Sequence, residues 1–263
     1  KINGVLAQYG ISSVEECFSV AFHTARENRR AVMHIFNSAN RDMFLQDTLL
    51  RGAEEGLQTI LEATRNLEIV TALGLPVWDK WDNKLYNCAA IIQKGEILGL
   101  IPKVYLPNYG EFYEQRWFAS GSGVEHGIEL CGQHVSLCTN QTFACDTMPN
   151  LVIGVEICED MWTPLPPSTF LALNGAEVIL NLSASNETIG KRAYRRGLVQ
   201  HQSAALNCVY AYCSAGSTES TQDLIFSGQS LIGEDGRLLA ETEEPIASDY
   251  MLVCDCDLGR IRA

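Results

Sequence analysis

A cysteine between acidic residues follows a predicted buried strand and could act as a nucleophile. The stretch VEICEDMW, residues 155–162, places Cys158 after the apolar run LVIGVEI and shortly before the proline-rich segment PLPPS. Side chains at such a strand-to-turn position emerge at the edge of a sheet. A thiol becomes an effective nucleophile when a cation or a helix N-terminus lowers its pKa and a base collects its proton. The local sequence leaves a second interpretation open, in which Cys158 is one more buried thiol.

A lysine at another predicted strand end supplies complementary chemistry. In IPKVYLPNYGEFYEQRWF, residues 101–118, Lys103 follows a strand and a proline. A lone cation in that place could stabilise an oxyanion. Taken alone, Lys103 is better explained as a solvated lysine after a hairpin. Two strand ends with complementary groups nevertheless favour a catalytic site.

Composition and charge limit the classes of function. The chain has 263 residues, of which 46% are apolar, enough for a large core in one α/β domain spanning residues 1–263. Its formal net charge of −13 repels phosphate backbones, so no nucleic-acid partner is expected. No apolar run reaches the roughly 18 residues that a membrane span needs, and no leader segment opens the sequence. We therefore expect a cytoplasmic protein without membrane association.

The cysteines and histidines do not form a metal-ligand pattern. Ten cysteines are scattered along the chain, several of them inside apolar runs such as NCAAII and CVYAYC, where free cysteine acts as a small hydrophobe. Cys254 and Cys256 form a single CxC pair without a second pair or a nearby histidine. Structural zinc needs four ligands, so no metal site is expected.

Hydrophobic patterning predicts strands and helices in alternation. Helices are expected at 13–28, 42–66, 169–176 and 187–206, with Gly175 as a stop signal; hairpins at 85–106, 127–137 and 229–241; and single strands at 31–36, 68–77, 151–158, 177–185, 208–216 and 250–258. Hairpins that alternate with helices favour mixed sheets covered by helices.

Four long motifs occur in an order that points to a known family. They are KVYLPNYGEFYEQRWF, GVEICEDMWTPLPPS, NLSASNETIGKRAYRR and SAGSTESTQDLIFSGQSLIGEDGRLLAE. Together they resemble the carbon–nitrogen hydrolase (nitrilase) superfamily, and more closely the glutamine amidotransferase (glutaminase) domain of glutamine-dependent NAD synthetases. The resemblance extends from about Asp42 to the end of the chain. It implies a four-layer αββα sandwich and a Glu, Lys and Cys triad.

The resemblance also implies roles for individual residues. Cys158 would attack the carboxamide of L-glutamine to form a γ-glutamyl thioester and release ammonia, after which water would release glutamate. Lys103 would stabilise the oxyanion together with a backbone N–H just after the cysteine. Tyr109 matches a tyrosine that lines the glutamine pocket, and Ser185 and Lys191 match the positions that hold the amino-acid end of the substrate.

Simpler interpretations exist for these substrate-binding positions. Glu111 matches an extra carboxylate that many family members place beside the lysine and cysteine. Tyr109 could instead be an interfacial aromatic residue, Ser185 a helix N-cap and Lys191 an exposed helix charge. The motif context favours the substrate-binding roles.

The triad glutamate has no match in the sequence. The resemblance places it after the strand AVMHIF, but that strand continues as NSANRDMF, where Asn37, Ser38 and Asn40 occupy the position and Asp42 begins a helix. Either the base belongs to residues missing between about 36 and 41, or the chain lacks it and Glu111 replaces it poorly. A general base contributes roughly two to four powers of ten in rate, so its loss would leave a slow or inactive enzyme.

The sequence therefore leaves three hypotheses. The first is a glutaminase domain without a cofactor of its own, which passes ammonia to an ATP-dependent NAD synthetase domain or chain. No SGGxDS phosphate loop occurs in these residues, so we expect the synthetase domain to be absent from them. The second is a stand-alone ω-amidase, and the third is an inactive scaffold that retains the fold. The resemblance further implies a homo-oligomer.

Overall fold

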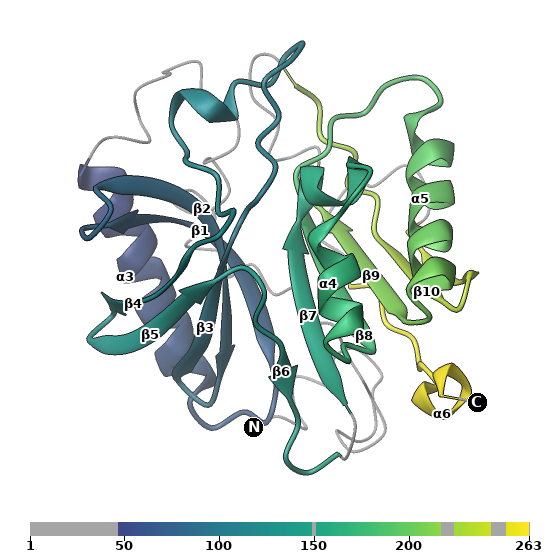
Figure 1. The fold of residues 1–263 in the computed structure, drawn as a ribbon, viewed down its shortest axis with the longest axis horizontal. Coiled ribbons are helices and arrows are strands. Elements are labelled where there is room, and N and C mark those ends of the chain that lie inside the picture. Colours follow the sequence, from purple (N-terminus) through teal and green to yellow (C-terminus); the bar gives the residue numbers. More distant parts are fainter. Residues whose placement is uncertain (1–46, 149–150, 217–223, 243–250, 263) are drawn as a thin grey trace.

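The computed structural model describes residues 47–148, 151–216, 224–242 and 251–262. Two β-sheets pack face to face, and helices cover their outer faces (Figure 1). The four-layer αββα sandwich expected from the sequence is thus confirmed. No helix in these ranges is long and apolar enough to cross a membrane.

The first sheet carries the strand that leads to Lys103. Its described strands are β1 (Thr71–Asp79), β2 (Lys84–Gln93), β3 (Glu96–Pro102), β4 (Glu125–Leu130) and β5 (Gln133–Cys138). They lie in the order β1-β2-β3-β5-β4, and β3 and β5 form its parallel pair. The predicted hairpins at 85–106 and 127–137 correspond to β2–β3 and β4–β5.

The second sheet carries the strand that leads to Cys158. Its described strands are β6 (Phe143–Ala144), β7 (Val152–Ile157), β8 (Val178–Ser183), β9 (Val209–Ser214), β10 (Leu231–Glu234) and β11 (Arg237–Glu241), in the order β11-β10-β9-β8-β7-β6. Because β7, β8 and β9 are parallel, their carboxyl ends meet at one edge of the sheet. The segments that follow β7 and β8 therefore lie side by side.

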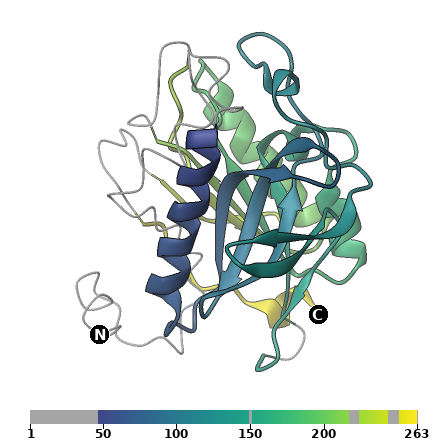
Figure 2. The ribbon, with the colours of Figure 1, turned by 90° about the vertical axis from the view of Figure 1, so that its left-hand side faces the viewer.

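Helices α3, α4 and α5 cover the outer faces of the sheets. The described helices are α3 (Asp47–Thr64), α4 (Pro167–Leu173), α5 (Lys191–Ala205) and the short α6 (Leu258–Ile261) near the end of the chain. Two short 3-10 turns are η3 (Glu114–Arg116) and η4 (Cys158–Trp162). Helix α3 lies on the outer face of the first sheet, and α4 and α5 lie on the outer face of the second (Figures 1 and 2).

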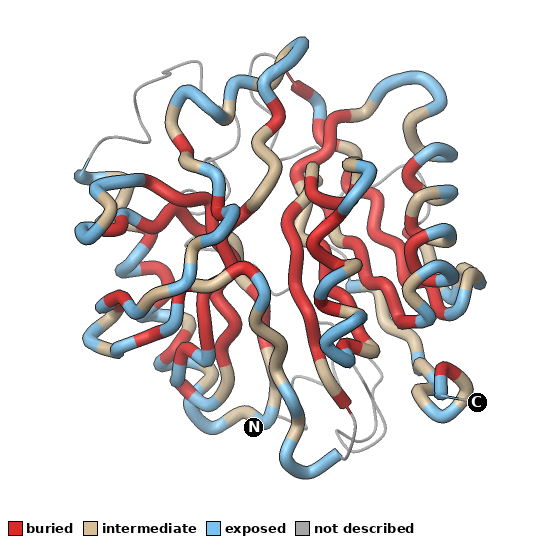
Figure 3. The backbone as a smooth tube through the Cα atoms, viewed as in Figure 1, coloured by how far each residue is buried: buried red, intermediate tan, exposed pale blue. Residues whose placement is uncertain are grey.

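The side chains of each strand alternate between two apolar layers. On β2, Ala89 and Ile91 pack between the two sheets, whereas Ala90 and Ile92 pack beneath α3. This alternation follows from the two-residue period of a strand. Because both faces are covered, the central strands are buried almost throughout (Figure 3), which explains their continuous apolar sequences.

Two predicted elements differ from the structure. Helix α5 begins at Lys191, four residues later than expected, because Gly190 has a φ of +83° and the segment before it pairs with Phe226 through Asn186. The described residues 251–257 form no strand. Their alternating apolar side chains pack against the layer between the sheets. The alternation of apolar residues in the sequence therefore arises from burial of one side of the segment and not from strand pairing. The predicted elements at 13–28 and 31–36 lie outside the described residues.

Gly154 on β7 tests how closely the sheet packs on α4. A Cβ at this position would lie 2.9 Å from Ile179 Cδ1 and 3.0 Å from Leu171 Cβ. We expect Gly154→Ala to lower the free energy of unfolding by about 1–3 kcal/mol through overpacking. Gly197→Ala is the matched control, because a Cβ there meets nothing within 4 Å and the residue lies inside α5. That variant should gain up to about 1 kcal/mol. Urea unfolding measures both changes, and equal effects would contradict the packing.

Candidate functional site

Cys158 lies at a sharp turn at the end of β7. It is the first residue of η4 and has a φ of +50°, in the left-handed region that non-glycine residues seldom adopt. This conformation costs roughly 1–2 kcal/mol. Cys131 has the same φ of +50°, so the conformation of Cys158 agrees with a functional site but does not identify one. The thiol is half-buried at the carboxyl edge of the second sheet, as the sequence predicted.

Lys103 is buried and paired, so its interpretation as a solvated lysine is wrong. It follows β3 directly, and its Nζ donates to the two carboxylate oxygens of Glu114 at 2.8 and 2.7 Å. Its side chain is fully buried, and that of Glu114 is 13% exposed. Burial lowers the pKa of Lys103, but Glu114 and then Cys158 raise it above its ordinary value. The ammonium group is therefore kept charged beside the thiol.

Asp160 joins the two segments that carry the lysine and the cysteine. Its Oδ1 accepts from the backbone N–H of Tyr105 at 2.8 Å, and its Oδ2 accepts from the backbone N–H of Ile157 at 2.9 Å. The carboxyl group is buried. It thus fixes the chain two residues after Lys103 to the chain one residue before Cys158.

Tyr109 and Glu159 form a polar contact next to the cysteine. The Tyr109 hydroxyl donates to Glu159 Oε1 at 2.8 Å, and its ring packs edge-on against Phe112. Tyr109 is 59% exposed. Burial raises the pKa of Glu159, although the hydrogen bond from Tyr109 and the charge of Lys103 lower it.

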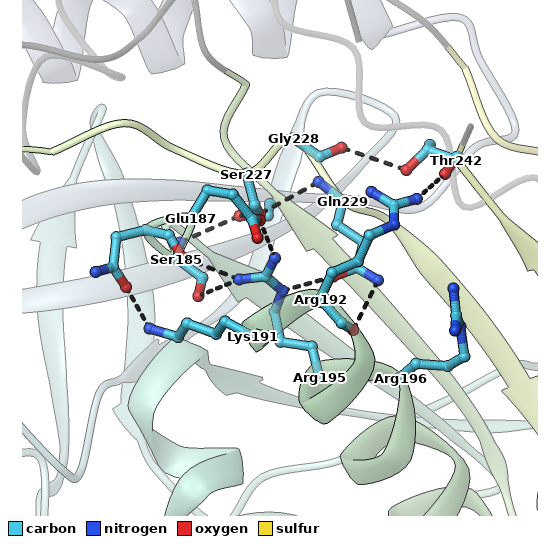
Figure 4. A network of polar contacts seen from close by, with 12 residues as sticks. Ser185, Glu187, Lys191, Arg192, Arg195, Arg196, Ser227, Gly228, Gln229 and Thr242 are labelled. Carbon is cyan, nitrogen blue, oxygen red and sulfur yellow. Dashed lines mark hydrogen bonds and ion pairs between the residues drawn. The ribbon is translucent and has the colours of Figure 1, made fainter. Parts of the chain in front are cut away.

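Ser185 and Lys191 lie on either side of the connection between β8 and α5. Ser185 is buried, and its Oγ accepts from Arg195 Nη1 at 3.2 Å. Lys191 (Figure 4) donates from Nζ to Asn186 Oδ1. Its Nζ also lies 5.1 Å from the centre of the Trp162 ring. Since the cap of α5 is Gly190, Ser185 is not its N-cap.

The family model for the carbon-nitrogen hydrolases matches residues 16–263. The chain belongs to this family.

Relatives of this carbon-nitrogen hydrolase include two glutamine-dependent NAD(+) synthetases. That of Mycobacterium tuberculosis is 41% identical over 222 residues, which cover 84% of this chain and 32% of the relative. That of Aquifex aeolicus is 31% identical over 222 residues, covering 84% of this chain and 35% of the relative. The chain thus spans about a third of the length of these relatives, and the resemblance to such synthetases is confirmed.

Solved structures agree with this assignment. A glutamine-dependent NAD(+) synthetase from Cytophaga hutchinsonii has a TM-score of 0.65 and 28% identity, covering 78% of this chain and 32% of the other. A carbon-nitrogen hydrolase from Helicobacter pylori has a TM-score of 0.64 at 18% identity, covering 87% of this chain and 75% of the other. The second likeness supports the fold alone.

One predicted position in this carbon-nitrogen hydrolase requires correction. The sequence interpretation placed Glu111 beside the lysine and cysteine, but the carboxylate that binds Lys103 is Glu114. Glu111 instead accepts from Asn186 Nδ2, whose Oδ1 binds Lys191. The 3-10 turn η3 is responsible, because it begins at Glu114 and leaves Glu111 in the loop before it. A substrate-binding role for Glu111 stays a prediction.

The thiol of Cys158 needs help to ionise. Burial raises its pKa, the Lys103 charge lowers it and Glu114 raises it again, with the net result above the ordinary value. The backbone of Ala184 and the side chain of Ser183 also favour the thiolate. Residues 31–42, where the family resemblance places the general base, lie outside the described residues.

Asp160 makes the stability of the fold depend on pH. Burial, and then the nearby Glu156, raise its pKa to about 7. Because the folded state holds this proton more tightly than the unfolded chain, the contribution of Asp160 to the free energy of unfolding should fall as pH rises from about 4 to about 7. In Asp160→Asn, which does not titrate, the change in the free energy of unfolding from pH 5 to 7.5 should be more positive than in wild type by roughly 2 kcal/mol. Urea unfolding at both pH values measures it, and the same pH dependence in the variant and wild type would contradict a raised pKa of Asp160.

Proposed function

We propose that this chain is a glutaminase domain that hydrolyses L-glutamine to glutamate and ammonia. The observation that carries the proposal is the buried Lys103–Glu114 pair, whose segment Asp160 ties through Tyr105 and Ile157 to the strand end that carries Cys158. A fixed cation can stabilise the charge that develops on the carbonyl oxygen in the transition state. Relatives that cover most of this chain are named as glutamine-dependent enzymes, which supports glutamine as the amide.

The reaction would proceed in two balanced steps. The Cys158 sulfur attacks the side-chain carbonyl carbon, the carbon–nitrogen bond breaks, and the thiol proton leaves with the nitrogen as ammonia. Water then attacks the γ-glutamyl thioester, the carbon–sulfur bond breaks, and glutamate leaves as the thiol regains a proton. Lys103 and the backbone N–H of Glu159 would stabilise the oxyanion in both steps.

The surrounding charges suit an amino acid. Glu159 could bind the α-ammonium group, and its position is fixed by the hydroxyl of Tyr109. Lys191 could bind the α-carboxylate, and burial lowers its pKa while Cys158 raises it. Ser185 and Glu111 complete the proposed substrate-binding set through their contacts with Arg195 and Asn186.

We further propose that ammonia passes to an ATP-dependent NAD synthetase domain or chain outside these residues. The names of the relatives support this, and this chain spans about a third of their length. The proposal includes a single hydrolase domain without its own cofactor, acting in the cytoplasm as part of a homo-oligomer.

Release of ammonia and glutamate from L-glutamine tests the proposal against its two alternatives. Equal amounts of both products from wild type, and none from Cys158→Ala, are expected. Turnover of other ω-amides with glutamine ignored would favour a stand-alone ω-amidase. Glutamine binding without turnover in either protein would favour the inactive scaffold.

A further inference from the structure

A buried arginine lies directly behind the predicted substrate-binding residues. Arg195 belongs to the second turn of α5, and its side chain has no exposed surface. A buried guanidinium group needs several partners to offset its desolvation. Its contacts therefore indicate which part of the fold it organises.

Arg195 binds three consecutive residues of the connection between β8 and α5. Its Nη1 donates to Ser185 Oγ at 3.2 Å and to the Asn186 carbonyl at 3.0 Å, while its Nη2 pairs with Glu187 (Figure 4). Its Nε donates to Gln229 Oε1 at 2.6 Å. The first three contacts fix side-chain or backbone positions in the connection that carries Ser185.

Asn186 transmits this arrangement to two charged side chains. Arg195 holds its backbone carbonyl, and its side-chain amide donates to Glu111 and accepts from Lys191. The amide is in a part of the chain that has neither helix nor strand, apart from one bridge to Phe226. Backbone hydrogen bonds hold the residues on either side, since the Glu187 N–H donates to the Ile225 carbonyl at 2.7 Å and the Ser227 N–H donates to the Ser185 carbonyl at 2.9 Å. Arg195 adds the contact to the carbonyl of Asn186 itself.

Gln229 anchors the arginine from the opposite side. Its Nε2 donates to the Arg192 carbonyl at 3.2 Å and to Glu241 Oε1 at 2.9 Å. Glu241 also binds Arg196 at 2.7 and 2.9 Å. The guanidinium of Arg195 is therefore held rigidly between the second sheet and the connection at 185–187.

We propose that Arg195 is a positioning residue that sets the affinity for the amino-acid end of the substrate through Ser185, Asn186 and Lys191. This inference rests on the proposed glutaminase function and deepens it. Arg195 itself does not touch the reacting atoms, so it should affect substrate binding far more than the reactivity of Cys158.

Arg195→Lys tests the inference, because lysine keeps the charge but lacks the planar fork that binds several partners at once. We expect KM for glutamine to rise about tenfold or more with kcat within about threefold, since ground-state binding is what is lost. Alkylation of Cys158 by iodoacetamide, which has no amino-acid end, should keep its wild-type rate. Alkylation by the chloroketone analogue of glutamine should slow about as much as KM rises. Equal slowing with both reagents, or no change in KM, would overturn the inference.

Two further variants keep the test decisive. Arg65→Lys is the control, because Arg65 follows α3, forms an exposed ion pair with Glu62 and makes none of the contacts to 185–187 or Gln229; its KM should stay at the wild-type value. Asn186→Ala removes the amide while leaving Arg195 in place, and it should also raise KM. An unchanged KM in Asn186→Ala would overturn the inference even if Arg195→Lys failed to fold.

Glutamine binding measured by calorimetry in the Cys158→Ala background separates two kinds of failure. If Cys158→Ala alone bound no glutamine, the proposed function would fail. If it bound glutamine with an affinity that Arg195→Lys left unchanged, only the positioning role would fail.

Discussion

Glutamine turnover should fall by about four to six powers of ten in Cys158→Ala, which is the scale seen when a nucleophile is removed from a catalytic unit. The alanine side chain cannot form the thioester, whereas Lys103, Glu114 and Tyr109 keep their contacts because none of their hydrogen bonds uses the sulfur. Glutamine binding should therefore persist. The backbone strain also persists, since alanine at φ +50° is no more relaxed than cysteine.

Steady-state release of ammonia measures this effect, with Cys254→Ala as the matched control. Cys254 is a half-buried cysteine packed against the layer between the sheets, three residues before Asp257. The Asp257 N–H donates to Glu234, which pairs with the start of β9, at the edge of the second sheet opposite Cys158. Its alanine variant should turn over glutamine at the wild-type rate. Residual wild-type turnover in Cys158→Ala would show that another group attacks the amide.

Lys103→Met should lose both stability and turnover. Methionine fills similar volume but leaves the Glu114 carboxylate, which is only 13% exposed, without its cation. Breaking a buried ion pair in this way costs about 3–5 kcal/mol. Glutamine turnover should fall by about two to three powers of ten relative to wild type, because the cation that stabilises the oxyanion is gone.

A double variant separates the two losses. Lys103→Met combined with Glu114→Gln removes the unpaired charge, so the free energy of unfolding should recover most of what the single variant lost. Turnover should stay low, because the cation is still absent. Urea unfolding and ammonia release on the same preparations measure both. A double variant that regained activity would mean that the pair serves the fold alone.

The sequence was sufficient to place the main reactive groups, because their positions follow from strand ends. Cys158 and Lys103 each follow an apolar run, and runs of that kind are the most readable feature of a sequence. The carboxyl ends of neighbouring parallel strands meet at one edge of a sheet. The proximity of the segments that follow β7 and β8 was therefore also predictable.

Residues placed by turns were harder to predict. Glu111 and Glu114 lie three positions apart in the same motif, and only the 3-10 turn at Glu114 determines which of them reaches Lys103. Sequence patterns carry little information about such short turns. In the sequence, Glu159 and Asp160 are simply acidic neighbours of the cysteine. In the structure, Asp160 accepts from the backbone of Tyr105 and joins two segments, whereas Glu159 accepts from the hydroxyl of Tyr109.

Arg195 was missed for a related reason. The motif KRAYRR contains three arginines, and the one that is buried depends on where the helix begins. The predicted start at 187 was four residues early, because contacts from the rest of the fold keep 187–190 out of the helix. Residues 251–257 show the same limit, since alternating burial without a pairing partner resembles a strand.

Covalent trapping of the cysteine tests the central claim most directly. Intact and peptide mass spectrometry of wild type treated with the chloroketone analogue of glutamine should find one adduct, on Cys158, with formation slowed by excess glutamine and absent in Cys158→Ala. An adduct on another cysteine, or labelling of Cys158 that glutamine does not slow, would contradict Cys158 as the nucleophile of a glutaminase.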